Sequence, residues 1–262
     1  MATKTTEQTK TVANKASLPG TISLTKESWA IFKHNYRILL PISLIFGVGT
    51  AISCLTQDLV QAQIITSVPT ALFFVLPIDL IFFYTSVLFI FTLKNKPTRV
   101  EFIDKTILKR ILPFLLVCLL YGLTVFGGII LLVIPGIIFG VWYYFANFVF
   151  LTEGLGVRAS FSKSKFYVKN HFWYVFLRLF YYGFLNMIAY VLFYTIIALI
   201  VGFIMHAFGG FADFYLSLVS AIVSIPFDSL ISAMGLIYGF QLYTSLKSLS
   251  PTQSAHKKSA KK

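Results

Sequence analysis

Long apolar runs separated by short polar segments dominate the chain. The runs cover residues 38–55, 68–93, 111–134, 137–152, 179–205 and 216–243. A helix needs about 20 apolar residues to cross roughly 30 Å of hydrocarbon, which is close to the length of most of these runs. Apolar residues follow one another without the alternation typical of strands in a membrane barrel. The pattern therefore predicts six transmembrane helices.

The stretch between Arg110 and Glu153 carries no charged residue. As one helix it would extend roughly 63 Å, about twice the thickness of the hydrocarbon core. Residues that permit a tight reversal lie near its middle, at Gly127, Gly128, Pro135 and Gly136. The stretch therefore predicts a helical hairpin, and the runs on either side of it predict two more.

A short basic stretch precedes each predicted hairpin, so the chain reads as a threefold repeat. The three stretches cover residues 23–37, 98–110 and 157–173. In the first, Leu24 and Phe32 share a face at about 100° per residue, with Lys26 roughly opposite. In the third, an apolar stripe is flanked by basic residues and consists of Val157, Phe161, Val168 and Phe172. We expect each stretch to form an amphipathic helix in the inner headgroup layer.

Composition supports the membrane interpretation. Hydrophobic residues make up 57% of the 262 positions and charged residues only 12%, with a mean hydropathy of +0.82, outside the usual range of soluble domains. We predict an all-α, polytopic membrane protein with six transmembrane helices in three hairpins, each preceded by a cytoplasmic amphipathic interfacial helix. This domain would cover residues 23–247, between a disordered basic N-terminal arm at 1–22 and a disordered basic tail at 248–262.

The distribution of basic residues predicts the orientation. The 22 lysines and arginines divide into groups of six, six, five and five, up to residue 37, at 94–110, at 158–178 and from 247 onward. The turns between these groups carry none, so the positive-inside rule places both termini in the cytoplasm. Because the charge is divided among four segments, it does not form a surface for nucleic acid. We expect a multi-pass protein of the bacterial plasma (inner) membrane, with an intracellular eukaryotic membrane as the alternative.

Part of the chain resembles a known family. The stretch IPGIIFGVWYYFANFVFLTEGLG, followed by an amphipathic basic helix and NHFWYVF, resembles the glycerophosphoryl diester phosphodiesterase membrane domain of bacterial integral membrane proteins. The residues that carry the resemblance are Pro135, Gly136, Glu153, Gly154, Phe161, Ser164, Lys169, Phe172 and Trp173, with Tyr238 as weaker support. It covers residues 23–247 and implies a multi-span protein of unknown role, or a membrane module that other members fuse to a catalytic barrel.

The chain does not contain the residues that such a barrel needs. A metal-assisted phosphodiesterase barrel requires some two hundred further residues and a cluster of His, Glu and Asp ligands. The four histidines, at 34, 171, 206 and 256, show no spacing of metal ligands. Nor does the chain contain a GxGxxG motif or a P-loop. We therefore expect no enzyme, no catalytic residue, no metal and no cofactor.

Two aspartates interrupt apolar runs at corresponding places. In VLPIDLIF and SIPFDSLI, Asp79 and Asp228 stand two residues after Pro77 and Pro226, whereas the middle hairpin has Ile137 there. An ionisable group at a helix centre costs some 2.5 to 3.5 kcal/mol, so the pair predicts an intramembrane polar site for a cation, a proton or a lipid headgroup. Alternatively, each aspartate caps the first turn of a helix that begins at its proline.

Glu153 ends a long apolar run and precedes two glycines, Gly154 and Gly156. This arrangement predicts a hinge in the loop, which Glu153 would anchor by pairing with Lys163, Lys165 or a backbone N–H.

These features favour a non-enzymatic integral membrane protein that associates with membrane lipids, chiefly anionic headgroups at the cytoplasmic face. A membrane-protein partner or a second copy of the chain is a further expected contact. The alternative is a small transporter or channel that uses Asp79 and Asp228. A lipid-modifying enzyme is a third hypothesis, for which the sequence offers no polar cluster.

Overall fold

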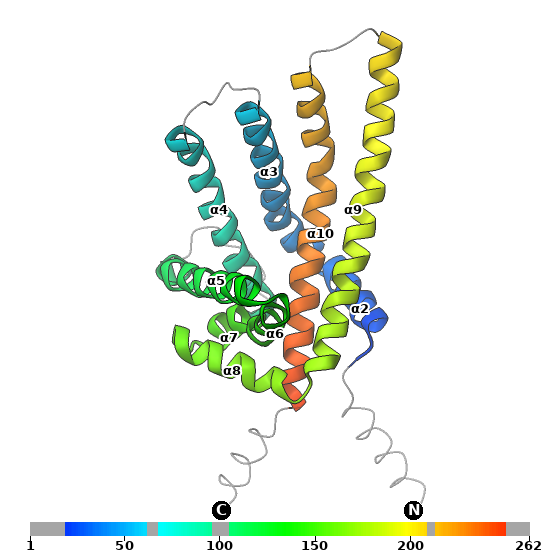
Figure 1. Ribbon diagram of the computed structural model, residues 1–262. Helices are drawn as coiled ribbons and strands as arrows, with labels where there is room; N and C mark the ends of the chain where they lie inside the picture. The colour runs from blue at the N-terminus through cyan, green and yellow to red at the C-terminus, as the bar shows by residue number, and fades with distance from the viewer. Residues whose placement is uncertain (1–18, 62–67, 96–104, 209–212, 250–262) are drawn as a thin grey trace, which may run out of the picture. The chain divides into compact units, whose positions relative to one another are not determined.

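The computed structural model is built of helices (Figure 1). It describes residues 19–61, 68–95, 105–208 and 213–249. The helices are α2 (Thr21–His34), α3 (Tyr36–Gln61), α4 (Val68–Asn95), α5 (Lys105–Leu131), α6 (Val133–Tyr143), α7 (Ala146–Glu153), α8 (Val157–Lys169), α9 (Phe172–Phe208) and α10 (Asp213–Leu249). No strand occurs among these described residues, in agreement with the all-α prediction.

Five helical segments are long and apolar enough to cross a membrane. They are Tyr36–Ser53, Lys109–Leu131, Val133–Glu153, Phe172–Phe203 and Leu218–Leu249. These segments make the chain compatible with an integral membrane protein. The apolar part of α4 whose side chains are described, Leu80–Asn95, is shorter than a span. The sixth crossing and the arrangement in three hairpins therefore stay predictions.

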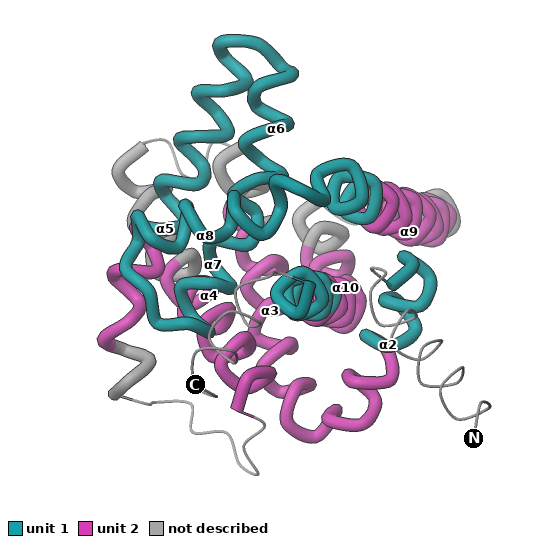
Figure 2. The backbone as a smooth tube through the Cα atoms, turned by 90° about the horizontal axis from the view of Figure 1, so that it is seen from below, with its two compact units in different colours: residues 1–28, 117–180, 238–262 teal, residues 29–116, 181–237 magenta. Residues whose placement is uncertain are grey.

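The chain divides into two compact units, each assembled from segments that are distant in sequence (Figure 2). Unit 1 contains residues 1–28, 117–180 and 238–262, and unit 2 contains residues 29–116 and 181–237. The single domain predicted over 23–247 stays a prediction. Most of the predicted arm (1–22) and nearly all of the predicted tail (248–262) lie outside the described residues, although α2 already begins at Thr21.

In unit 2, α3 packs against two other helices through different sides. Its contact with α4 is aromatic, because the buried Phe46 ring lies 4.8 Å from Phe82 and 6.3 Å from Phe89. Its contact with α10 depends on Gly47, where a Cβ would collide with the carbonyl oxygen of Ile225 and with Ser229 Oγ. Small residues allow helices in lipid to approach closely and gain dispersion contacts.

In unit 1, α5 and α6 form the reversal predicted for the uncharged stretch. Leu132 alone separates the two helices, with extended backbone angles (φ −168°, ψ 144°). A Cβ on Gly128 would lie 2.8 Å from the Cα of Gly136. Because no side chain fits between these two backbones, glycine is required for the close approach. The prediction that glycines permit this turn agrees with the structure.

Two of the three predicted interfacial helices occur as separate helices, α2 and α8. The second does not within the described residues, because α5 runs without a break from Lys105 to Leu131. No glycine or proline stands between Lys105 and Arg110 to end a helix there, so the basic turn continues directly into the apolar segment. Residues 98–104 lie outside the described part. The cytoplasmic location of α2 and α8 stays a prediction.

The buried face of α8 agrees with the predicted apolar stripe at Val168 and differs from it elsewhere. Ser160, Ser164, Tyr167 and Val168 are buried, whereas Phe161 is only half-buried. Ser164 donates a hydrogen bond to the Trp142 carbonyl oxygen at 2.7 Å. Small hydroxyl side chains let α8 lie close to α6 and α7, and their polar atoms bond to backbone carbonyls.

Candidate functional site

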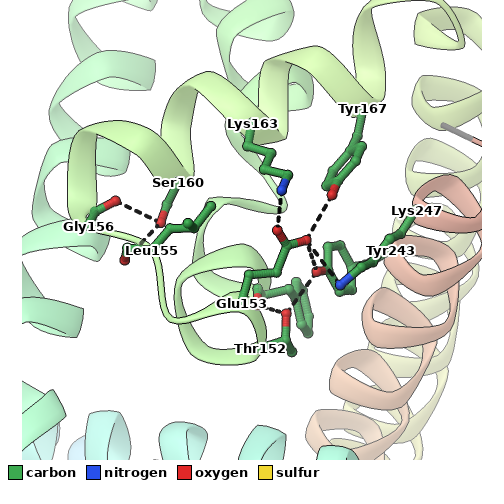
Figure 3. Close-up of polar contacts among 10 residues, drawn as sticks. Thr152, Glu153, Leu155, Gly156, Ser160, Lys163, Tyr167, Tyr243 and Lys247 are labelled. Atoms are coloured by element: carbon green, nitrogen blue, oxygen red, sulfur yellow. Dashed lines mark hydrogen bonds and ion pairs between the residues drawn. The ribbon is translucent and has the colours of Figure 1, made fainter. Parts of the chain in front are cut away.

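A cluster of polar side chains surrounds Glu153 in unit 1 (Figure 3). Glu153 is the last residue of α7, Lys163 and Tyr167 come from α8, and Tyr243 and Lys247 come from the end of α10. Figure 3 shows all four of these side chains pointing at the carboxylate. Residues that are up to 94 positions apart in the sequence therefore converge on a single acid.

Both oxygens of the Glu153 carboxylate are engaged. Oε1 accepts hydrogen bonds from the hydroxyls of Tyr167 (2.8 Å) and Tyr243 (2.7 Å), and Lys247 Nζ lies 3.2 Å away. Oε2 lies 2.7 Å from Lys163 Nζ. The side chain of Glu153 is only 9% exposed, and a carboxylate at this depth is stable only with such partners.

Aromatic side chains pack against the Glu153 cluster and support Tyr243. The Tyr243 hydroxyl also lies 2.8 Å from Thr152 Oγ1, and its ring stacks on Phe148 with centroids 6.0 Å apart. Phe148 in turn packs against the backbone of Gly239, where a Cβ would lie 3.0 Å from the Phe148 ring. The position of Tyr243 is therefore determined by packing as well as by its hydrogen bonds.

Tyr167 is held in its neutral form. Burial raises the pKa of the Tyr167 hydroxyl above the usual range, and the hydrogen bond to Glu153 and the negative charge of Glu153 add to this effect. An anionic Tyr167 would repel the carboxylate, whereas the neutral hydroxyl donates to it. Tyr167 therefore remains a hydrogen-bond donor at neutral pH.

Two glycines determine the backbone conformation of the loop between α7 and α8. Gly154 has a left-handed backbone (φ 69°) and its N–H donates to the Phe150 carbonyl oxygen at 3.1 Å, which ends α7. Gly156 is extended (φ −65°, ψ 161°) and precedes α8. The structure thus contains the predicted turn at Gly154 and Gly156, and its role as a hinge stays a prediction.

One of the predicted partners of Glu153 is correct. Lys163 pairs with it, whereas Lys165 lies over the Trp142 ring at 4.2 Å. Sequence reasoning missed Tyr243 and Lys247, because nothing local relates α10 to residue 153. The Tyr167 contact could have been found, since Lys163 and Tyr167 are four residues apart and share a helix face.

The outward face of α8 combines basic and aromatic residues. Arg158, Ser162, Phe166 and Lys169 are all exposed, and their spacing places them on one side of the helix. The Phe166 side chain is 50% exposed. We call these four residues the outward face. With two lysines against one carboxylate, the neighbouring Glu153 cluster also retains a net positive charge.

Asp228 lies inside α10, in unit 2. Its side chain is 1% exposed, and neither carboxylate oxygen has a hydrogen-bond partner in the described part of the chain. The hydroxyl groups of Ser224, Tyr190 and Tyr194 lie near it.

The alternative in which the aspartates cap helices is wrong. α10 begins at Asp213 and contains Pro226, and α4 begins at Val68, so positions 228 and 79 both lie in helix interiors. An interior proline is tolerated in a membrane helix because neighbouring groups satisfy the carbonyl that it frees. The side chain of Asp79 lies outside the described part, so the pairing of the two acids in one site stays a prediction.

Within the described residues, no group of three or more His, Cys, Asp or Glu side chains is arranged to hold a metal ion. No family model, curated protein or solved structure matches the chain.

Proposed function

We propose that the chain is a non-enzymatic, multi-pass membrane protein that associates with anionic lipid headgroups through α8. In this proposal six spans form three hairpins in a bacterial inner membrane, both termini are cytoplasmic, and a protein partner or a second copy can add to the contact. The resemblance to the glycerophosphoryl diester phosphodiesterase membrane domain is part of this proposal and implies a multi-span protein, without indicating its role.

The observation that carries the proposal is the outward face of α8. Phe166 is half exposed between Arg158 and Lys169, and the chain around it supplies five segments compatible with membrane crossing. An aromatic ring flanked by cations is the composition of a helix at the level of the headgroups. Basic residues near an anionic membrane surface contribute about 1 kcal/mol each.

Native mass spectrometry of the purified full chain tests this role. Phosphatidylglycerol should be retained in preference to phosphatidylethanolamine. Replacing Arg158 and Lys169 by glutamine should weaken phosphatidylglycerol binding about fivefold for each charge removed, from about 1 kcal/mol per cation. Arg158→Lys together with Lys169→Arg, which keeps both positive charges on the outward face, is the matched control and should leave phosphatidylglycerol binding unchanged. Equal retention of the two lipids, or binding that the α8 variants leave unchanged, would contradict the proposal.

A second candidate is a small transporter or channel that uses Asp79 and Asp228. The burial of the Asp228 carboxylate favours it, because ionisable groups inside membrane helices mark ion and proton pathways. Its test is ion flux in proteoliposomes, in which Asp79→Asn and Asp228→Asn should each abolish a flux that the unmodified chain supports. If the unmodified chain gives no flux above that of empty liposomes, this candidate fails.

A further inference from the structure

A row of polar side chains runs along α9 on the side that meets α10 within unit 2. Tyr182, Asn186, Tyr190 and Tyr194 recur every four residues, so they lie one above another along the helix. They interrupt the apolar segment Phe172–Phe203.

Contacts with α10 fix the direction of this row. The Tyr182 hydroxyl lies 3.8 Å from the place of a Cβ on Gly235. The Tyr190 ring lies 5.3 Å from the Phe227 ring, and Phe193 stacks on the same ring at 3.9 Å. The polar row of α9 therefore faces the turn of α10 that contains residues 227 and 228.

Asp228 lies at this contact, with its oxygens close to three hydroxyls, those of Ser224, Tyr190 and Tyr194. The Ser224 hydroxyl donates to the Ala221 carbonyl oxygen at 3.0 Å, which leaves its oxygen able to accept. An ionised carboxylate can only accept hydrogen bonds. In this arrangement Ser224 can bond to Asp228 when the carboxyl group itself carries a hydrogen.

No cation among the described side chains stands close enough to balance an ionised Asp228. α3, which packs against α10 at Gly47, has no charged or titratable residue among its described side chains from 38 to 56. The described side chains of α9 and α10 in unit 2 contribute tyrosines and no second charge. Tyr190 and Tyr194 are therefore the titratable groups that face Asp228. A buried, unpaired carboxylate is neutralised most readily by taking up a proton.

We propose that Asp228, with the hydroxyls of Ser224, Tyr190 and Tyr194, forms a proton-binding site within the membrane-spanning part of the chain. The proton adds to one carboxylate oxygen and is taken from water. The new O–H then donates to the Ser224 oxygen, and a tyrosine hydroxyl donates to the other oxygen. This site is independent of lipid association at α8, and it does not require that the chain transports ions.

Two carbodiimides of different solubility test the proposal on the full chain in phosphatidylethanolamine and phosphatidylglycerol vesicles. Dicyclohexylcarbodiimide reaches protonated carboxyl groups from the lipid, whereas a water-soluble carbodiimide reaches exposed acids such as Glu27. Peptide mass spectrometry identifies the modified residue. We expect Asp228 to react with the lipid-soluble reagent alone. Above the pH at which half of the Asp228 carboxyl groups are protonated, the rate should fall about tenfold for each pH unit, as for loss of one proton.

Three variants complete the experiment. Asp228→Asn should lose the adduct. Tyr190→Phe should shift the pH midpoint of labelling, because it removes one of the hydroxyl groups that lie near the Asp228 carboxyl group. Tyr181→Phe, at an exposed neighbour of the row, should leave the midpoint unchanged.

The proposal is overturned by any of four results. These are no reaction at Asp228 at the lowest pH, equal reaction with both reagents, a rate that does not depend on pH, and protection by Na⁺ or K⁺ at constant pH. Protection by a metal ion would assign the site to that cation.

Discussion

Glu153 is the residue on which three helices of unit 1 converge. Its four partners come from α8 and α10, and the acid itself ends α7. A hydrogen bond to a charged group contributes about 1.5–3 kcal/mol, but the two lysines are 40% and 36% exposed, so solvent weakens the ion pairs. The tyrosine hydroxyls are therefore expected to contribute most of the stabilisation.

Glu153→Gln tests this balance. The amide oxygen still accepts from both tyrosines, whereas the two ion pairs are lost, and we expect the free energy of unfolding to fall by about 1–2 kcal/mol. Circular dichroism during titration of detergent-solubilised protein with sodium dodecyl sulfate measures the change. Glu27→Gln, at an exposed acid of α2, should change stability by less than about 0.5 kcal/mol. Equal effects of the two substitutions would show that the two ion pairs contribute no stability.

At the scale of elements, adjacent glycines of α5 have different roles. A Cβ on Gly128 would lie 2.8 Å from the Cα and 2.9 Å from the N of Gly136, both of them backbone atoms, whereas a Cβ on Gly127 meets nothing within 4 Å. Backbone atoms cannot move aside as the end of a side chain can. The two positions therefore provide a matched pair for testing the α5–α6 reversal.

Gly128→Ala should destabilise the protein by about 1–3 kcal/mol, as expected for overpacking. Gly127→Ala should be neutral or stabilise by up to about 1 kcal/mol, because alanine favours a helix interior. Thermal unfolding of the two variants in the same detergent makes the comparison. A Gly128→Ala protein as stable as Gly127→Ala would show that the hairpin opens without cost.

The elements show where sequence reasoning succeeds and where it does not. Continuous apolar runs predicted the positions of five helical segments that are long enough to cross a membrane, and the glycines predicted the reversal near residue 132. The apolar periodicity did not predict the buried face of α8 correctly, because this face contains two polar residues, Ser160 and Ser164, that pack against neighbouring helices. It also predicted a break before α5 that the described residues do not have. Contacts such as Glu153 with Lys247 depend on tertiary structure and leave no local pattern.

For the whole molecule, the distribution of basic residues makes a prediction about sidedness. We expect Asn95, at the end of α4, and Ser162, in α8, to face one compartment, and Leu132, at the α5–α6 reversal, to face the other. All three positions are exposed. Single cysteines at these positions, in a chain with Cys54 and Cys118 replaced by alanine, can be labelled with a membrane-impermeant maleimide in cells and in inverted vesicles. Labelling of residues 95 and 162 from opposite sides would refute the predicted orientation.

The helix α9 has a further consequence for the bilayer around it. Its apolar segment Phe172–Phe203 contains 32 residues and would measure about 48 Å at 1.5 Å per residue. The hydrocarbon layer is nearer 30 Å, so a helix of this length must lean steeply or stretch the surrounding lipid. Lipids with longer acyl chains would relieve that mismatch. In a membrane with both thin and thick regions, the protein should therefore partition into the thick ones.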